Sequence, residues 1–408
     1  MTAMKNALLI AAACLLALLS TIGASLPYPI LPPLFASGAA NGLNQFMGLP
    51  PKLLFGVAIM INPLGLLIGS ALLGPMSDRY GRRPVLLLTA CGAALGHAVT
   101  AVAMLLESYP LFLAARFATG LLEGNGAVAR AMLAERLDGP LRLRAIAWLN
   151  GAFHLGWLAG PLLAGLTVGF GVTVPFWIAV GALLAVALLV ALALPGEAPS
   201  TLTTSWWQVA RDRHALNLLR HGELRTLFAA QLAATCGVTA FYEYYPLWLV
   251  EFAGYDTQGI AAINVALCGV MTLASLSAGR AGDGPPLRRA ACFAFGIAAA
   301  VGLVGAGGLW LGMAGIVLFG IPNAYYNATV QNWAAERFSG HGMGAVMGLL
   351  STTFCLANIL MALAGSVLTL IDTRLILLLG AGLSAWAGWR LLAWRPMAAP
   401  MNLSEARK

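Results

Sequence analysis

Charged residues are scarce in this chain. Of its 408 residues only 9% are Asp, Glu, Lys or Arg, whereas soluble domains carry about 25%. Apolar residues make up 60% of the chain, and its mean hydropathy is +0.83. This balance excludes an ordinary water-soluble globular domain.

The chain also lacks paired cysteine spacings such as CxxC. Its six cysteines all lie within apolar runs, which argues against a disulfide framework or a zinc site. We therefore expect free thiols packed among apolar neighbours, and no bound metal. The cysteines are Cys14, Cys91, Cys236, Cys268, Cys292 and Cys355.

Signatures of soluble enzymes and of nucleotide hydrolysis are missing as well. The sequence contains no HExxH, no GxSxG and no GxxxxGK[ST], so neither a metalloprotease, a serine hydrolase nor a P-loop ATPase is indicated. We expect a protein that is not an enzyme, needs no cofactor and does not use ATP.

What the chain has is a succession of apolar runs of about 20 residues, the length that a helix needs to cross a bilayer. We predict an all-α polytopic membrane protein with twelve transmembrane helices. The first run is too long for a secretory signal and is expected to stay as a helix. The predicted spans are 7–31, 53–76, 84–106, 110–134, 143–169, 174–195, 226–250, 259–279, 290–309, 312–334, 344–370 and 375–394.

Basic residues fix the predicted orientation. With the N-terminus inside, 19 of the 23 Lys and Arg residues fall on the cytoplasmic side, and only Lys52 and Arg374 fall outside. Cytoplasmic loops are enriched in Lys and Arg, so both termini are predicted to be cytoplasmic in a bacterial inner (plasma) membrane. The basic residues stand singly or in short clusters at the ends of apolar runs, so the net charge of +8 indicates topology and no nucleic-acid partner.

The chain carries signs of an internal duplication. GPMSDRYGRR follows the second predicted span, and GRAGDGPPLRR, residues 279–289, follows the eighth. Parallel six-span halves with a substrate site between them are a known transporter architecture. We predict two pseudo-symmetric six-helix bundles, over residues 1–195 and 225–396, with a cytoplasmic linker over 196–224 and a short cytoplasmic tail over 397–408.

On these features the sequence resembles the major facilitator superfamily of secondary transporters over its whole length. The loop motif GxxxDRxGRR of that superfamily is matched in full between the second and third spans. In the resembled family the acidic residue pairs with loop arginines and with the N-terminus of the eleventh helix, here near 341–344, as a latch that favours the outward-open state. The residues concerned are Gly74, Asp78, Arg79, Gly81, Arg82 and Arg83. Two of them, Gly74 and Gly81, are expected to permit close packing and a tight turn.

Further motifs resemble the twelve-span drug/proton antiporter branch. The segment GWLAGPLLAG in the fifth span is similar to the antiporter motif GxxxGPxxGG, and RFATG in the fourth span is similar to RxxQG. Apart from the family, glycines four apart let a neighbouring helix approach closely, and a proline behind them predicts a place to bend. The alternative is ordinary packing of small residues. The motif residues are Gly156, Gly160, Pro161 and Gly165.

The fourth span carries three ionisable residues at heptad spacing, Arg116, Glu123 and Arg130. In one continuous helix they would share a face, and an ionisable group in mid-membrane is a functional candidate. A carboxyl at Glu123 that meets dry and wet surroundings in turn can load and release a proton, so we predict a proton-coupling role for Glu123 and Arg116. The alternatives are a static ion pair for Glu123 and a fixed partner of an acid or an anionic substrate for Arg116. Arg130 is expected to extend to the membrane surface.

The seventh span places Glu243 toward the outer side within a run of aromatic residues. It fits either an interfacial aromatic belt or an outer gate and substrate contact. Polar residues at i, i+4 spacing line one face of the seventh and of the tenth spans. Lipid would leave them unpaired, so they are predicted to face a substrate cavity or to bond between helices. The predicted cavity residues are Glu243, Gln231, Thr235, Thr239, Asn323, Tyr326, Asn327, Gln331 and His154.

Taken together, the resemblance implies a proton-coupled exporter of a small molecule that works by alternating access as a monomer in the lipid bilayer. A drug-like cargo, as in multidrug resistance, and a polar carboxylate metabolite or siderophore stay open as alternatives. A proton-coupled nutrient importer is a third possibility, and a sensor or scaffold without transport is a fourth.

Overall fold

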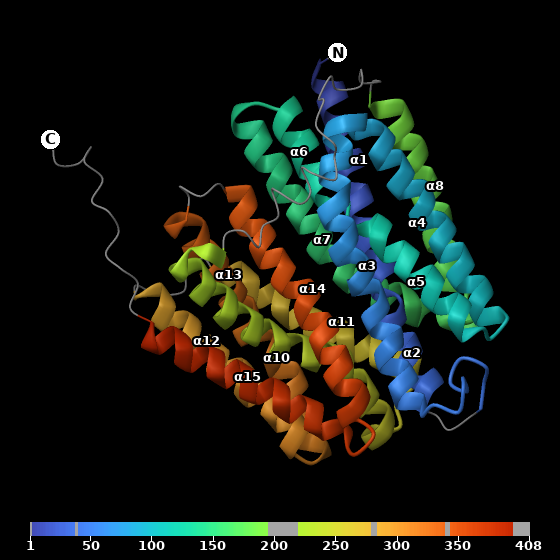
Figure 1. The fold of residues 1–408 in the computed structure, drawn as a ribbon, viewed down its shortest axis with the longest axis vertical. Helices are drawn as coiled ribbons and strands as arrows, with labels where there is room; N and C mark the ends of the chain where they lie inside the picture. Colours follow the sequence, from blue (N-terminus) through green and yellow to red (C-terminus); the bar gives the residue numbers. More distant parts are fainter. Residues whose placement is uncertain (1, 37–39, 195–218, 279–283, 339–342, 395–408) are drawn as a thin grey trace, which may run out of the picture.

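The computed structural model describes residues 2–36, 40–194, 219–278, 284–338 and 343–394. Outside these ranges lie the predicted tail, all of the predicted linker except residues 219–224, the acidic residue of the second loop copy (Asp283), and the first half of the segment 341–344. The described residues form α-helices and one short 3-10 helix. They separate into two bundles, blue to green and yellow to red in Figure 1. The expected all-α polytopic architecture is confirmed.

The first bundle is formed by the helices before the linker. Helices α1 and α7 pack together, α3 packs on α5, and α4 packs on both α5 and α8. The helices are α1 (Thr2–Ser25), α2 (Pro27–Ala36), α3 (Pro51–Tyr80), α4 (Arg82–Leu105), α5 (Tyr109–Glu123), α6 (Gly126–Arg136), α7 (Gly139–Thr167) and α8 (Val174–Ala193), with the 3-10 helix η1 (Val168–Phe170).

The second bundle follows the linker. Helix α12 packs on α13 and α15, α10 packs on α14 and α15, and α11 packs on α13. The helices are α10 (Gly222–Ala253), α11 (Thr257–Ala278), α12 (Pro286–Ala306), α13 (Leu309–Arg337), α14 (Met343–Leu368) and α15 (Thr373–Ala393).

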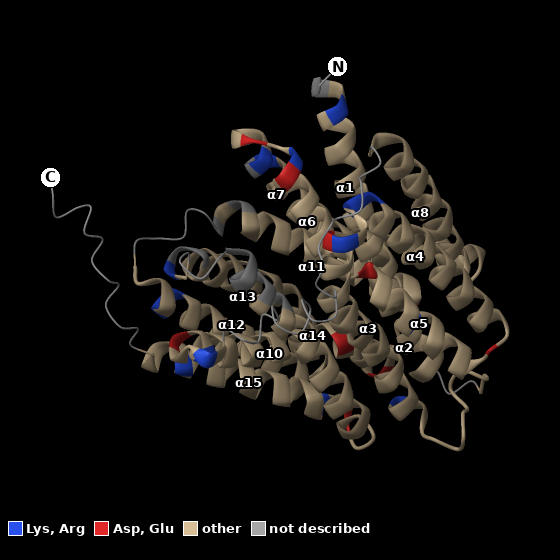
Figure 2. Cartoon of the chain, turned by 45° about the horizontal axis from the view of Figure 1, so that its top comes forward, with Lys and Arg blue, Asp and Glu red and all other residues tan. Residues whose placement is uncertain are grey.

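Ten helical segments among the described residues are long and apolar enough to cross a membrane. Two predicted spans are not among them: 110–134, which is broken in two, and 344–370, where α14 contributes the shorter apolar helix Thr352–Leu368. Figure 2 shows most of the charged residues near helix ends, with few inside the bundles. All six cysteines are free, and Cys91 and Cys292 are exposed, so the expected packing of every thiol is wrong for these two.

Breaks in two predicted spans have local causes. The first span divides into α1 and α2 at Leu26, which precedes Pro27; a residue before proline avoids the helical conformation. The fourth span divides at Gly124 and Asn125, between α5 and α6. Glycine is a poor helix former, and the Asn125 side chain donates to hydroxyls of two other helices, Ser20 at 3.2 Å and Thr89 at 3.4 Å.

The turn between α3 and α4 is made by Gly81. Its φ of 93° lies in the region that favours glycine, and its N–H donates to the carbonyl of Ser77 at 3.0 Å. The expected close packing at Gly74 is not observed, since no described atom lies within 4 Å of the position that a Cβ would take there.

The two bundles meet on one side of the molecule, which we call the far side: it is the side where α2 ends and α3 begins, opposite to Thr2. There α3 packs on α14, α7 on α11 and α2 on α10. A Cβ on Gly56 of α3 would lie 2.3 Å from the Cβ of Ser366 of α14. The backbones therefore approach closely between the bundles at this side.

Candidate functional site

The centre of the first bundle holds a buried carboxyl with two partners. Glu123 ends α5 and is only 5% exposed. Its Oε1 lies 3.0 Å from Nε2 of His97 on α4, and its Oε2 accepts a 3.2 Å hydrogen bond from Nδ2 of Asn62 on α3. His97 is fully buried, and its Nδ1 has no partner among the described residues. An acid and an imidazole at this distance can share one proton.

Arg116 lies two turns before Glu123 on α5 and is 3% exposed. Its Nη1 donates to the carbonyl of Gly23 at 3.3 Å and its Nη2 to that of Ala24 at 3.2 Å. These carbonyls belong to the last turn of α1, whose acceptors have no partner within the helix. Arg116 therefore caps the break between α1 and α2.

Gly23 brings α1 against the acid–imidazole pair. A Cβ at this position would lie 2.1 Å from Nε2 of His97 and 2.8 Å from Oε1 of Glu123. Both distances are far below van der Waals contact, so only a residue without a side chain fits here. The pair is thus enclosed by α1, α3, α4 and α5.

A small cavity lies next to this cluster, between the two bundles. Its volume is about 40 Å³, enough for a few water molecules at most. Helices of the first bundle and α14 of the second bundle enclose it. Its lining includes Tyr28, Asn62, Arg116, Trp157, Phe354 and Asn358. Asn62 both lines the cavity and donates to Glu123, so it connects the cavity with the buried acid.

Glu243 lies on α10 and is not itself part of this cavity lining, but it is close enough to interact with Tyr28, which is. It is 2% exposed, and neither carboxyl oxygen has a hydrogen-bond partner among the residues described. A residue of an interfacial belt would keep its polar end at the surface. The belt interpretation is therefore wrong for Glu243, and its contact with the cavity stays a prediction.

The polar stripes bond largely to each other. Tyr326 of α13 donates to Oε1 of Gln231 on α10 at 3.1 Å, and Gln231 donates to Thr235 at 3.3 Å. On α13 the Nδ2 of Asn327 donates to Oδ1 of Asn323 at 2.9 Å. The open alternative of helix–helix hydrogen bonding is thus observed between Gln231 and Tyr326. The buried Thr239 and Asn323 and the exposed Gln331 and His154 are not part of the cavity lining either.

The helix break corrects the expected face of the fourth span. Arg116 and Glu123 share α5, whereas Arg130 lies on α6. Its Nε donates to Oδ1 of Asn150 at 3.4 Å, and its guanidinium lies 5.4 Å from the centre of the Phe153 ring. Arg130 is therefore set apart from the buried pair and faces α7.

The glycines of the fifth span lie at helix contacts. A Cβ on Gly156 would lie 2.6 Å from Cβ of Thr21 on α1, and a Cβ on Gly160 would lie 1.9 Å from Oγ of Ser25, also on α1. The Ser25 hydroxyl donates a 3.2 Å hydrogen bond to the carbonyl of Gly156. Helix α7 continues through Pro161. Gly165 faces α11 of the other bundle, with 2.3 Å from its Cβ position to Ala261 Cβ. The motif thus packs α7 against α1 of its own bundle and against α11 of the other bundle.

The charged residues at the junction of α3 and α4 form contacts within the first bundle. Asp78 pairs with Arg82 at 2.6 Å, and Arg82 also pairs with Glu135 of α6 at 2.6 Å and bonds to Ser77. Arg83 donates to the carbonyl of Ala191 on α8 at 2.7 Å, and Arg79 lies over the ring of Tyr80. The partner segment 341–344 falls outside the described residues except for the start of α14.

An ion pair joins the bundles on the far side. Lys52 at the start of α3 contacts Glu251 near the end of α10, with 2.7 Å between Nζ and Oε1, and donates to Thr373 of α15 at 3.4 Å. One turn further in, the rings of Phe55 and Tyr244 meet edge to face with centroids 6.0 Å apart. The far side is closed in this conformation.

Sequence reasoning missed four residues of these sites: His97, Asn62, Lys52 as a partner, and Glu251. The rule that an ionisable group inside a span is a candidate applies to His97 and would have found it. Asn62 carries no charge, and the Lys52–Glu251 contact joins positions almost 200 residues apart. The role of Asn62 and the Lys52–Glu251 contact are revealed only by the packing of the helices.

A family model and curated relatives of this chain indicate the same protein family. The model of the Major Facilitator Superfamily matches residues 13–360. Among curated proteins, the class B tetracycline resistance protein of Escherichia coli is 34% identical over 157 residues, 38% of this chain and 36% of that protein. The human major facilitator superfamily domain-containing protein 10 is 33% identical over 170 residues, 36% of each chain. These matches span only about a third of each relative.

Solved structures match almost the whole chain. The crystal structure of the human organic anion transporter MFSD10 has a TM-score of 0.70 at 21% identity and covers 95% of this chain and 99% of its own. The inward-open xylose transporter XylE of E. coli has a TM-score of 0.72 at 16% identity and covers 99% of both chains. At these identities the likeness shows the fold.

Proposed function

The chain belongs to the Major Facilitator Superfamily and is a secondary transporter, and we propose that it exports a small molecule in exchange for protons. The observation that carries the proposal is the buried cluster of Glu123, His97 and Asn62 beside the cavity. The cavity is too small for a substrate in this conformation, so it must widen when the bundles move apart; a proton on this cluster and a substrate in the widened cavity would then both act on Asn62. Each can therefore change the affinity for the other, as exchange requires.

The proposed cycle alternates access between the two sides. We assign the far side to the exterior and both termini to the cytoplasm, from the distribution of Lys and Arg. In this conformation the exterior is closed by Lys52–Glu251 and Phe55–Tyr244. When the exterior opens, Glu123 takes up a proton there. It releases the proton to the cytoplasm, and the substrate then moves outward.

The energy of one proton suffices for export. One charge that crosses about 100 mV gains about 2.3 kcal/mol, and one pH unit adds about 1.4 kcal/mol. Since 1.4 kcal/mol corresponds to a tenfold ratio, one proton per cycle sustains a substrate gradient of a few hundredfold.

A drug-like cargo is favoured over a carboxylate or siderophore. Curated relatives include tetracycline resistance proteins of several classes. The cation that would meet an anionic cargo is Arg116, and both of its terminal nitrogens already donate to backbone carbonyls. Because the human relative is described as an organic anion transporter, the experiment below includes an organic anion among the compounds tested.

Transport by reconstituted protein tests the proposal. The protein is inserted into liposomes with an acid interior so that its cytoplasmic side faces outward. The test panel consists of tetracycline, a lipophilic cation, an organic anion and a sugar. We expect the liposomes to accumulate at least one of these compounds. The same uptake should vanish when the pH gradient is collapsed. If uptake of every compound is the same with and without the pH gradient, the protein does not exchange its substrate for protons. Drug susceptibility and secreted metabolites of deletion and overexpression strains would then identify the natural cargo.

The far-side ion pair is predicted to bias the conformational equilibrium. Its side chains are 30% and 20% exposed, so the pair contributes at most about 1 kcal/mol, a factor of about five in the equilibrium. Lys52→Glu should raise the rate at which an impermeant thiol reagent outside labels Ala58→Cys in the cavity lining. Adding Glu251→Lys should restore the slow rate. A rate that neither substitution changes would show that the pair does not hold the far side closed.

The charged junction of α3 and α4 is predicted to act as a latch. Asp78→Asn removes the charge that Arg82 contacts at 2.6 Å and that a helix N-terminus would attract. We expect transport by this variant to fall about tenfold with protein levels unchanged, while Arg79→Lys, which keeps the charge, transports well. Normal transport by Asp78→Asn would end the latch hypothesis.

A further inference from the structure

The second bundle holds its own buried carboxyl, and its surroundings differ from those of Glu123. Glu243 lies on α10 and is 2% exposed. Whereas Glu123 has two partners, neither oxygen of Glu243 has one within the described part of the chain. The cost of removing an ionised carboxylate from water without a partner is several kcal/mol. In this conformation the carboxyl is therefore the neutral acid.

Among the described residues no cation pairs with Glu243 to offset a charge. The titratable groups that interact with it are Tyr28 on α2 and, on its own helix, Cys236 and Tyr244. Helices α2 and α14, which pack on α10, contain no Asp, Glu, Lys, Arg or His. Helices α12, α13 and α15, which also pack on it, have charged residues only in their terminal turns.

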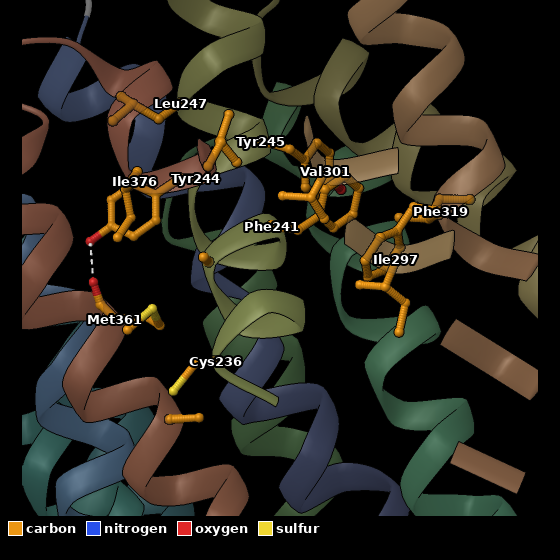
Figure 3. Packing of buried hydrophobic residues seen from close by; sticks show 14 of the residues in the cluster. Cys236, Phe241, Tyr244, Tyr245, Leu247, Ile297, Val301, Phe319, Met361 and Ile376 are labelled. Atoms are coloured by element: carbon orange, nitrogen blue, oxygen red, sulfur yellow. Dashed lines mark hydrogen bonds between the residues drawn. The ribbon is translucent and has the colours of Figure 1, made fainter. Parts of the chain in front are cut away.

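Tyr244, the residue that follows Glu243 on α10, belongs to the far-side closure. Its ring contacts the ring of Phe55 across the bundles. The Tyr244 hydroxyl donates to the carbonyls of Met361 at 3.4 Å and Ala362 at 3.2 Å on α14, and Figure 3 shows the first of these bonds. Glu251 of the ion pair is eight residues further along α10, about 12 Å at 1.5 Å per residue. Separation of the bundles at the far side would thus bring water to Glu243.

We propose that Glu243 is a second proton-binding site, loaded from the far side when the bundles part there and shielded as a neutral acid when they close. The proton passes from water at the far side to a carboxylate oxygen and is released later in the cycle to water on the cytoplasmic side, so no other reactant is needed. This inference rests on the proposed proton-coupled function and deepens it: each bundle contributes one carboxyl, and up to two protons move per cycle. Glu243 then acts on coupling and not as a substrate contact.

Infrared spectroscopy of the full chain in lipid tests the proposal without a substrate. A protonated carboxyl with no hydrogen bonds has a carbonyl stretch at higher frequency than a hydrogen-bonded one. We expect this band in the wild-type protein, its persistence in alkaline buffer, and its loss in Glu243→Gln. Glu123→Gln should keep it. A Glu243→Gln spectrum identical to that of the wild type would overturn the assignment.

A variant held open at the far side tests where the proton comes from. A Cβ at Gly56 already overlaps Ser366, so Gly56→Trp should prevent closure, and the Glu243 band should then disappear as the pH rises. Gly181→Trp on α8 is the matched control, because no atom of the described residues lies within 4 Å of a Cβ there, and its band should stay insensitive to pH. A band that Gly56→Trp leaves insensitive to pH would refute loading from the far side.

The two hypotheses fail in different experiments. If the wild-type protein in liposomes ignores a pH gradient while the spectra behave as expected, Glu243 binds a proton but the proposed exchange is wrong. If gradient-driven uptake is observed and the band is missing, the exchange stands and the second site is wrong.

Discussion

Glu123→Gln is expected to reduce proton-driven uptake to the level of empty liposomes. The amide keeps the size of the side chain but cannot take up and release a proton, and it ends the sharing of a proton with His97 at 3.0 Å. Folding should be little affected, because an amide can still bond to Asn62. Exchange of labelled for unlabelled substrate needs no net proton movement and should persist. The measurement is uptake with and without a pH gradient, next to the exchange rate.

Glu107→Gln provides the matched control for this variant. Glu107 is exposed in the turn between α4 and α5, and its Oε2 accepts a 2.8 Å bond from the N–H of Gly42, which a glutamine oxygen can also accept. Its uptake should equal that of the wild type. Gradient-driven uptake by Glu123→Gln at the wild-type rate would remove Glu123 from the coupling mechanism.

The sequence was sufficient to find the acid at the centre of the first bundle, but not its partners. Glu123 and Arg116 are conspicuous because charges inside apolar runs are costly and therefore rare. His97 also lies inside a predicted span, but a histidine alone in a run does not reveal which carboxyl it meets. Asn62 is 61 residues from Glu123, and no local pattern connects them.

Helix periodicity predicted faces without predicting neighbours. The i, i+4 spacing correctly placed Gln231 and Thr235 within bonding distance on α10. That Gln231 bonds to Tyr326 of α13 depends on how two helices pack, and the spacing leaves a cavity and a helix contact equally possible. The break at Gly124 and Asn125 was missed for a related reason: what stabilises it is bonding of Asn125 to α1 and α4, which is tertiary.

Adding a single methyl group at Gly23 should reduce both stability and transport strongly. In Gly23→Ala the added methyl would lie 2.1 Å from Nε2 of His97. The imidazole is fully buried and lies near the Phe176 ring, with centroids 6.3 Å apart, so it has little room to withdraw. Extra volume in a packed interior costs about 1–3 kcal/mol. We expect lower thermal stability and a loss of proton-driven uptake of at least tenfold, both measured on the purified protein.

A control and a second-site change show whether the clash with His97 is the cause. Gly181→Ala adds the same methyl to α8, where no described atom lies within 4 Å. Because alanine favours the helix by up to about 1 kcal/mol, this variant should be neutral or stabilising. His97→Ala removes the ring that the methyl meets. If the clash is the cause, Gly23→Ala should cost little further stability in the His97→Ala background, since contacting residues are not additive. Equal costs in both backgrounds would show instead that the methyl acts through Glu123 or the α1 backbone, and that the acid–imidazole pair does not set the requirement for glycine.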